Sequence, residues 1–271
     1  MRFAATCGVL AVVAALSGVP RTAAYAAATP MDWSSVIKQA VPAVVDISVE
    51  TLATRNGVQQ RERAAGTGFL TDPDGTIVTN RHVIEGAFRI LVTMSDGSQY
   101  EAKLIGAGAV LDIAVLKIEA GHPLPSLAFA DSRKAEIGEP LVVIGNPLGL
   151  GISVSSGIVS AVHRDLMNTP VDDYIQTDAA INHGNSGGPV LDRDGKVLAV
   201  ATILVTSSEG QGSQGLGFAI ASNEASRTVK HLIDASSAPR WLDRGAFAGC
   251  HPGAEECVSF ATYWWISCYR N

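Results

Sequence analysis

Residues 189–204 have the sequence PVLDRDGKVLAVATIL. Two apolar runs flank the turn sequence DRDG at 192–195, a pattern typical of a β-hairpin. Similar short runs, separated by Gly, Asp and Pro, recur through most of the chain. The predicted strands are 44–49, 66–70, 76–79, 90–94 and 113–118, then 140–144, 153–162, 174–177, 189–191, 197–204 and 216–220. Strands this short favour antiparallel barrels or sandwiches over parallel α/β units.

The strands fall into two series, on either side of a Pro-rich and polar stretch at 121–139. We therefore predict an all-β fold of two six-stranded antiparallel β-barrels, the first over 41–125 and the second over 136–222. Helical periodicity predicts short helices at 30–40 and 223–235. The polar stretch 51–65 is predicted to be a flexible loop.

The N-terminus predicts export. Arg2 precedes an apolar run at 3–19, and Ala24-Tyr25-Ala26 is a small-x-small cleavage site, which together indicate a signal peptide at 1–26. The alternative is an uncleaved anchor, but the run is shorter than the roughly 20 residues of a membrane span. We expect a periplasmic or secreted protein with no stable membrane span after cleavage. Its net charge of −6 does not indicate nucleic-acid binding.

Three residues carry the predicted chemistry. Ser186 lies in the loop GNSGGP at 184–189, His82 follows the strand at 76–79, and Asp112 precedes an apolar strand. A nucleophilic serine needs a base, and that base needs an orienting group. The order His, Asp, Ser is the chymotrypsin order, and it places His82 and Asp112 in the first barrel and Ser186 in the second. Each residue alone is better explained as structural; the three together favour a catalytic triad.

Glycines around the serine let the backbone turn sharply and let an acyl group approach closely. The backbone amides of this loop, at Gly184, Asn185 and Ser186, are the predicted oxyanion hole.

Several stretches together resemble the protease domain of the HtrA/DegP family. They are GTGF at 66–69, TNRHV at 79–83, DIAVLKI at 112–118, IGNPLGL at 144–150, SSGIVSAV at 155–162, IQTDAAIN at 175–182, GNSGGPV at 184–190 and GLGFAI at 215–220. The resemblance covers about 33–235. It implies a trypsin-like fold over 27–238 without cofactor or metal, with His82 as general base, Asp112 as its orienter and Ser186 as nucleophile.

The predicted substrate pocket is apolar. Trypsin-type enzymes that cut after Lys or Arg carry an acid six residues before the serine, where this chain has Ala180. Ile181 and Leu204 add apolar lining, so we predict cleavage after small or aliphatic residues. The resemblance implies unfolded or damaged exported proteins as substrates, a role in protein quality control under stress, and a homotrimer held by N-terminal residues such as Tyr25 or Trp33.

The chain departs from the family pattern in two places. His183 stands where the family usually has proline, which is either a tolerated surface change or a source of mobility or pH sensitivity in the oxyanion loop. The tail at 239–271 begins like a PDZ domain at 240–242 and then loses the likeness, while Cys250, Cys257 and Cys268 cluster in it. A truncated or frame-shifted tail and a natural tail peculiar to this protein both fit.

Three functions remain open from the sequence. The first is a serine endopeptidase that forms an acyl-enzyme. The second is a chaperone-like or latent binder of unfolded polypeptides, because a triad can sit in an inactive geometry. The third is a processing protease with one narrow substrate.

Overall fold

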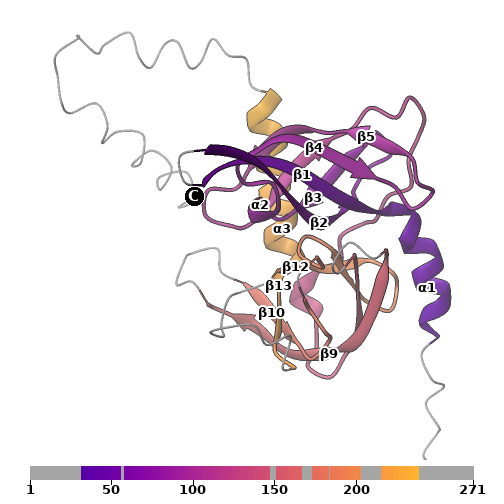
Figure 1. Cartoon of the computed structure of the whole chain (residues 1–271). Helices are drawn as coiled ribbons and strands as arrows, with labels where there is room; N and C mark the ends of the chain where they lie inside the picture. Colours follow the sequence, from indigo (N-terminus) through magenta and orange to yellow (C-terminus); the bar gives the residue numbers. More distant parts are fainter. Residues whose placement is uncertain are drawn as a thin grey trace, which may run out of the picture. The chain divides into compact units, whose positions relative to one another are not determined.

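The computed structural model describes residues 32–55, 58–146, 151–166, 173–182, 184–202 and 215–237. The predicted signal peptide at 1–26 and the predicted tail at 239–271 lie outside these residues. The described chain is mostly β, with two antiparallel sheets that occupy separate parts of the molecule (Figure 1). No helix in the described ranges has both the length and the apolar character needed to cross a membrane.

Among the described residues, the first sheet has seven strands in the order β5-β4-β1-β2-β3-β7-β6. Their bounds are β1 Val44–Arg55, β2 Val58–Leu70, β3 Thr76–Thr79, β4 Ala87–Thr93, β5 Gln99–Glu101, β6 Lys103–Ala107 and β7 Ala114–Lys117. Ala102 alone separates β5 from β6, yet these strands form opposite edges of the sheet. The chain therefore bends at Ala102 from one edge to the other, which curls the sheet into a barrel. Counted as one bent strand, β5 and β6 bring the number to the predicted six.

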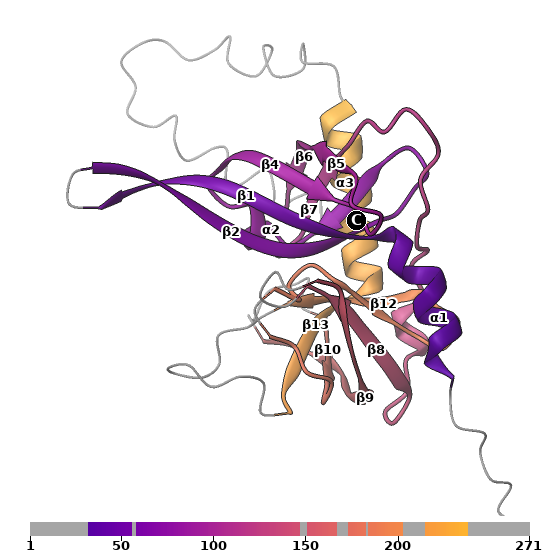
Figure 2. The ribbon, with the colours of Figure 1, turned by 45° about the vertical axis from the view of Figure 1, so that its right-hand side comes forward.

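The predicted flexible loop at 51–65 is wrong, because these residues belong to a long hairpin. Strands β1 and β2 pair from Val44 opposite Phe69 to Arg55 opposite Val58. Figure 2 shows the two strands running together well away from the other strands of the sheet. A ribbon with solvent on both faces has no apolar side, so its strands lack the alternation by which strands are recognised. A cross-strand pair between Arg63 and Glu50, 3.2 Å apart, lies on its surface.

The second sheet is a closed barrel in the order β10-β13-β12-β11-β8-β9. Its strands are β8 Pro140–Gly145, β9 Ser153–Arg164, β10 Tyr174–Thr177, β11 Pro189–Leu191, β12 Val197–Thr202 and β13 Gly217–Ala221. Strand β11 pairs with β12 across the turn at 192–195, as the hairpin pattern of residues 189–204 predicts. The predicted architecture of two antiparallel barrels is confirmed.

Alternate residues of the second barrel serve two different cores. Leu141 and Val143 on β8 belong to the barrel's own core, whereas Val142 and Ile144 belong to a larger core with residues of the first sheet. Successive side chains on a strand point to opposite faces, so a strand buried on both sides is apolar throughout. The second barrel is thereby seated against the first through a continuous apolar layer.

Five helical segments complete the described fold. They are α1 Trp33–Ala40, η1 Val41–Ala43, α2 Arg81–Ile84, η2 Ser132–Lys134 and α3 Ser222–Ser237. The helices predicted before and after the barrels correspond to α1 and α3. Helix α3 contacts β6 of the first sheet and β12 of the second. The side chain of Asn223, at the start of α3, donates to Asp131 at 2.9 Å and accepts from the Ser132 amide at 3.2 Å, which ties α3 to η2.

Candidate active site

His82 lies in α2, a single helical turn that follows β3. Asn80 connects the strand to this turn, and its buried side chain donates to the backbone carbonyl of Asp112 at 2.7 Å. The bond anchors the start of α2 to the segment that precedes β7. The His82 side chain is 42% exposed, so its ring is accessible to a substrate.

The Asp112 carboxylate accepts three hydrogen bonds. His82 donates twice, from Nδ1 to Oδ2 at 2.6 Å and from its backbone amide to Oδ1 at 2.9 Å. Thr202 Oγ1, on β12 of the second barrel, donates to Oδ2 at 3.2 Å. If the carboxylate is the acceptor, Nδ1 is the donor, and in a neutral imidazole Nε2 is then the nitrogen with the lone pair. The arrangement leaves the imidazole in the tautomer that a general base requires.

Three successive carbonyls of the loop around Ser186, those of residues 184–186, accept hydrogen bonds from within the protein. Thr67 of β2 donates from its hydroxyl to Gly184 O at 2.6 Å and from its amide to Ser186 O at 2.9 Å. The carbonyl of Asn185 accepts from the Gly188 amide at 2.9 Å. With three successive carbonyls bonded internally, the loop conformation is fixed by the first barrel as well as by its own turn.

The amides of the same loop differ from one another. The Asn185 amide donates to Asn182 O at 3.0 Å, and the Gly187 amide donates to Ala201 O at 2.9 Å. The Ser186 amide has no acceptor among the described residues. An oxyanion hole needs donors that are not already engaged. Of the three predicted donors, the Asn185 amide is engaged here, so the prediction stays with Ser186 and with Gly184.

Two glycines allow this loop to approach the first barrel. Gly187 has a φ of 82°, and a Cβ there would overlap the Thr67 carbonyl and the Thr79 hydroxyl. A Cβ at Gly188 would overlap the carbonyl of Ile144. The glycines that the sequence marked around the serine are thus required by close backbone approach as well as by conformation.

The described hydrogen bonds join His82 to Asp112 but include none from Ser186 Oγ to His82. Ser186 is buried, with 4% of its surface exposed. The serine loop nevertheless lies against the segment that leads to His82, since a Cβ on Gly187 would be 2.9 Å from the Asn80 amide nitrogen. Hydrogen bonds between catalytic groups are often loose without substrate and tighten when it binds.

Of the residues predicted to line the substrate pocket, the structure describes two. Ala180 is exposed, and its carbonyl accepts from Ser155 Oγ at 2.8 Å and from Asn185 Nδ2 at 3.2 Å. Ile181 is 7% exposed and packs in the core of the second barrel. Leu204 and His183 lie outside the described residues.

Sequence reasoning missed Thr202, Asn80 and Thr67. Thr202 is the single hydroxyl in a fully buried strand, VLAVAT, and a polar side chain in such a run needs a partner. That signal could have singled out Thr202. Asn80 and Thr67 lie inside motifs already quoted, but their partners are distant in sequence, so their roles emerge only from the fold.

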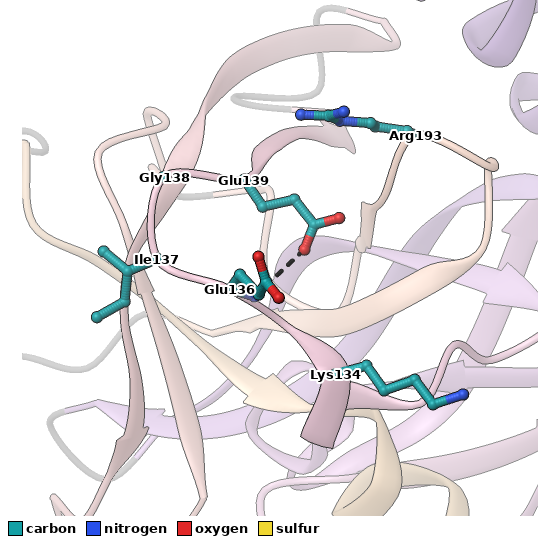
Figure 3. A pocket seen from close by; sticks show the side chains of 6 residues that line it. All are labelled: Lys134, Glu136, Ile137, Gly138, Glu139 and Arg193. Carbon is teal, nitrogen blue, oxygen red and sulfur yellow. Dashed lines mark hydrogen bonds between the residues drawn. The ribbon is translucent and has the colours of Figure 1, made fainter.

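A separate surface hollow of about 480 Å³ lies away from these residues (Figure 3). Its lining is Lys134, Glu136, Ile137, Gly138, Glu139 and Arg193. The Glu136 amide donates to Glu139 Oε2 at 3.4 Å, and the two cations flank this acidic pair. None of the predicted site residues contributes to this hollow.

Comparison with known proteins places the fold in a family. The family model "Trypsin-like peptidase domain" matches residues 66–200. A solved variant of the HtrA-type protease AlgW, with decapeptide, superimposes with a TM-score of 0.70 at 31% identity over 76% of this chain and 68% of that one. The chain belongs to the HtrA family of serine proteases. The resemblance drawn from the sequence motifs is confirmed.

Curated HtrA relatives are similar over the same region. A probable periplasmic serine endoprotease DegP-like from Chlamydia muridarum is 48% identical over 65% of this chain and 35% of its own length. The protein of that name from Halomonas elongata is 38% identical over 78% of this chain and 52% of its own length. The chain therefore spans between about a third and a half of the curated relatives that it matches.

Proposed function

We propose that this HtrA-family chain is a serine endopeptidase with Ser186 as nucleophile. The observation that carries the proposal is the Asp112 carboxylate, which holds His82 by two hydrogen bonds and is itself held by Thr202 from the other barrel. Among the described residues, these bonds engage Nδ1 and the backbone amide of His82 and leave Nε2 available to act as a base. Family membership and the catalytic order His, Asp, Ser give independent support.

The mechanism follows from the positions of these groups. His82 Nε2 takes the Ser186 Oγ proton as Oγ bonds to the substrate carbonyl carbon, and the carbonyl becomes a tetrahedral oxyanion. The Ser186 and Gly184 amides are the proposed donors to that oxyanion. His82 then gives the proton to the leaving nitrogen as the C–N bond breaks, which leaves an acyl-enzyme. Water gives a proton to His82 Nε2 as its oxygen bonds to the acyl carbon, and His82 returns that proton to Ser186 Oγ as the C–Oγ bond breaks and the acid product leaves.

The proposed substrates are unfolded or damaged exported polypeptides cleaved after small or aliphatic residues. Ala180 stands where an acid would pair with a basic substrate side chain, and its neighbour Ile181 is apolar. The relatives from Chlamydia and Halomonas are named periplasmic. We accordingly propose an exported protein, and the homotrimer stays a prediction.

One observation favours a second candidate, a latent binder of unfolded chains. Ser186 Oγ makes no hydrogen bond with His82 among the described residues. A chain that stays in this arrangement would hold polypeptides without cutting them.

Digestion of casein by the full chain tests both functions. We expect peptides in which small or aliphatic residues precede the cut, and a loss of at least about 10⁴-fold in rate for Ser186→Ala. Product sequencing gives the specificity. Cuts after Lys or Arg would contradict the pocket assignment, a single narrow cleavage would indicate a processing protease, and casein bound but uncut would favour the latent binder.

A further inference from the structure

Thr67 connects the first barrel to the serine loop with both its backbone and its side chain. It lies on β2, fully buried. Its amide donates to Ser186 O at 2.9 Å and its hydroxyl donates to Gly184 O at 2.6 Å. Its carbonyl accepts from Thr79 Oγ1 at 2.7 Å, which fixes β2 to β3 at this point. No other described residue bonds to two carbonyls of the serine loop.

The direction of the Thr67 hydroxyl is set by a third group. The Asn146 amide donates to Thr67 Oγ1 at 2.9 Å. A hydroxyl has one hydrogen, so an oxygen that accepts from Asn146 directs its own hydrogen to Gly184 O. Asn146 is in turn held by its side chain, which donates to Asp46 Oδ1 at 2.9 Å and accepts from the Gly151 amide at 2.7 Å. The hydroxyl is therefore oriented before any substrate arrives.

The bond to Gly184 fixes one peptide group of the serine loop. The carbonyl of the 184–185 peptide group is held by Thr67, and its amide is held by Asn182 O at 3.0 Å. Gly184 has a φ of 99°, a region that glycine enters with little penalty and from which it can also leave freely. The local chain thus has little preference of its own, and the two hydrogen bonds decide how the peptide group is turned.

We propose that Thr67 is a positioning residue for the oxyanion hole, acting through its hydroxyl on the Gly184 carbonyl. With that carbonyl held toward β2, the 184–185 peptide group is fixed between the two peptide groups that carry the Gly184 and Ser186 amides, which limits how far either amide can turn away from the developing oxyanion. The inference rests on the proposed peptidase function and adds to it a residue of the first barrel that touches neither substrate nor the reacting atoms.

Two matched pairs of variants test this role in the full chain. Thr67→Val removes the hydroxyl and keeps the shape of the wild type, while Thr67→Ala and Thr67→Ser differ from each other in the hydroxyl alone. For a synthetic peptide that spans one of the casein cleavage sites, we expect Thr67→Val to lower kcat by about 10- to 100-fold, with KM little changed. Thr67→Ser should keep most of the wild-type kcat, and Thr67→Ala should lose it.

A control separates positioning from stability. Thr76 is also a buried threonine of the first barrel, and it belongs to the end of β3 remote from Thr79 and the serine loop. Thr76→Val should lower the free energy of unfolding yet leave kcat per folded molecule unchanged. If Thr67→Val does not fold, the comparison of Thr67→Ser with Thr67→Ala decides.

The outcomes are distinguishable. An active wild type whose kcat is matched by Thr67→Val, or equal kcat for Thr67→Ser and Thr67→Ala, would overturn the role of Thr67 alone. A higher KM with unchanged kcat for Thr67→Val would also overturn the role of Thr67, because an oxyanion donor acts on the transition state. A wild type without peptidase activity would overturn the proposed function and this inference with it.

Discussion

At the scale of single residues, Gly187 is where the requirement for glycine is most severe. Its φ is positive, and the space for a Cβ is filled by Thr67 and Thr79. Gly97 has a similar φ of 86° but no atom within 4 Å of its Cβ position. Substitution of Gly97 therefore reports the cost of the backbone conformation alone, whereas substitution of Gly187 adds the cost of a steric clash.

We expect Gly97→Ala to lower the free energy of unfolding by about 1–2 kcal/mol, the cost of the left-handed conformation. Gly187→Ala should lower it by more than about 3 kcal/mol, because the clash is added to that cost. Urea denaturation followed by circular dichroism measures both. Equal losses for the two variants would mean that the serine loop can move away from β2 without penalty.

The residues of the proposed site were predictable to different extents. His82, Asp112 and Ser186 each stand in a short motif, and their order in the chain carries information without any structure. Thr202 and Thr67 carry no such signal in sequence order, since their partners lie 90 and 117 residues away. Which hydroxyl meets which acceptor is decided by how the two barrels pack, and a sequence pattern does not contain that contact.

At the scale of elements, the β1–β2 hairpin and strands β5 and β6 show why some strands escape prediction. Alternation of apolar and polar residues marks a strand with one buried face. In the hairpin, residues 59–65 are exposed apart from half-buried Glu62, and β5 has only one residue that is even half-buried. Strands that bury a face in either core were predicted within a few residues, whereas these were missed or taken as a loop.

The hydrogen bonds between η2 and α3 should make the free energy of unfolding depend on pH. Arg133, and after it Asn223, bond to Asp131 and hold the pKa of that carboxyl well below its usual range. The unfolded chain takes up the proton near pH 4, while the folded chain stays ionised to lower pH. The stabilising effect of Asp131 is therefore complete at neutral pH and declines as the pH falls below about 4.

We expect Asp131→Asn to be less stable than the wild type at pH 7, and the difference to shrink at pH 3. Urea denaturation at the two pH values measures it. In an Arg133→Gln background the difference between Asp131 and its Asn variant should be smaller at pH 7, because the main cause of the lowered pKa is gone. A difference that stays constant from pH 7 to pH 3 would contradict the assignment.

At the scale of the whole molecule, each of the two barrels supplies part of the proposed site. The first supplies His82 and Asp112, the second supplies Ser186 and Thr202, and bonds between the barrels bring each half into register. The number of barrels was predictable because turns and strands recur in two series. The place where the first sheet curls toward closure was not, because it depends on a bend at Ala102 in a stretch that the sequence did not mark as strand.

Labelling of the full chain with a fluorophosphonate shows whether this assembly of residues activates Ser186 as a nucleophile. We expect one label per chain, mapped to Ser186 by digestion and mass spectrometry. Ser186→Ala should take up none, and His82→Ala should react far more slowly because the base is gone. A folded wild type that stays unlabelled, or a label that persists in Ser186→Ala, would contradict the claim.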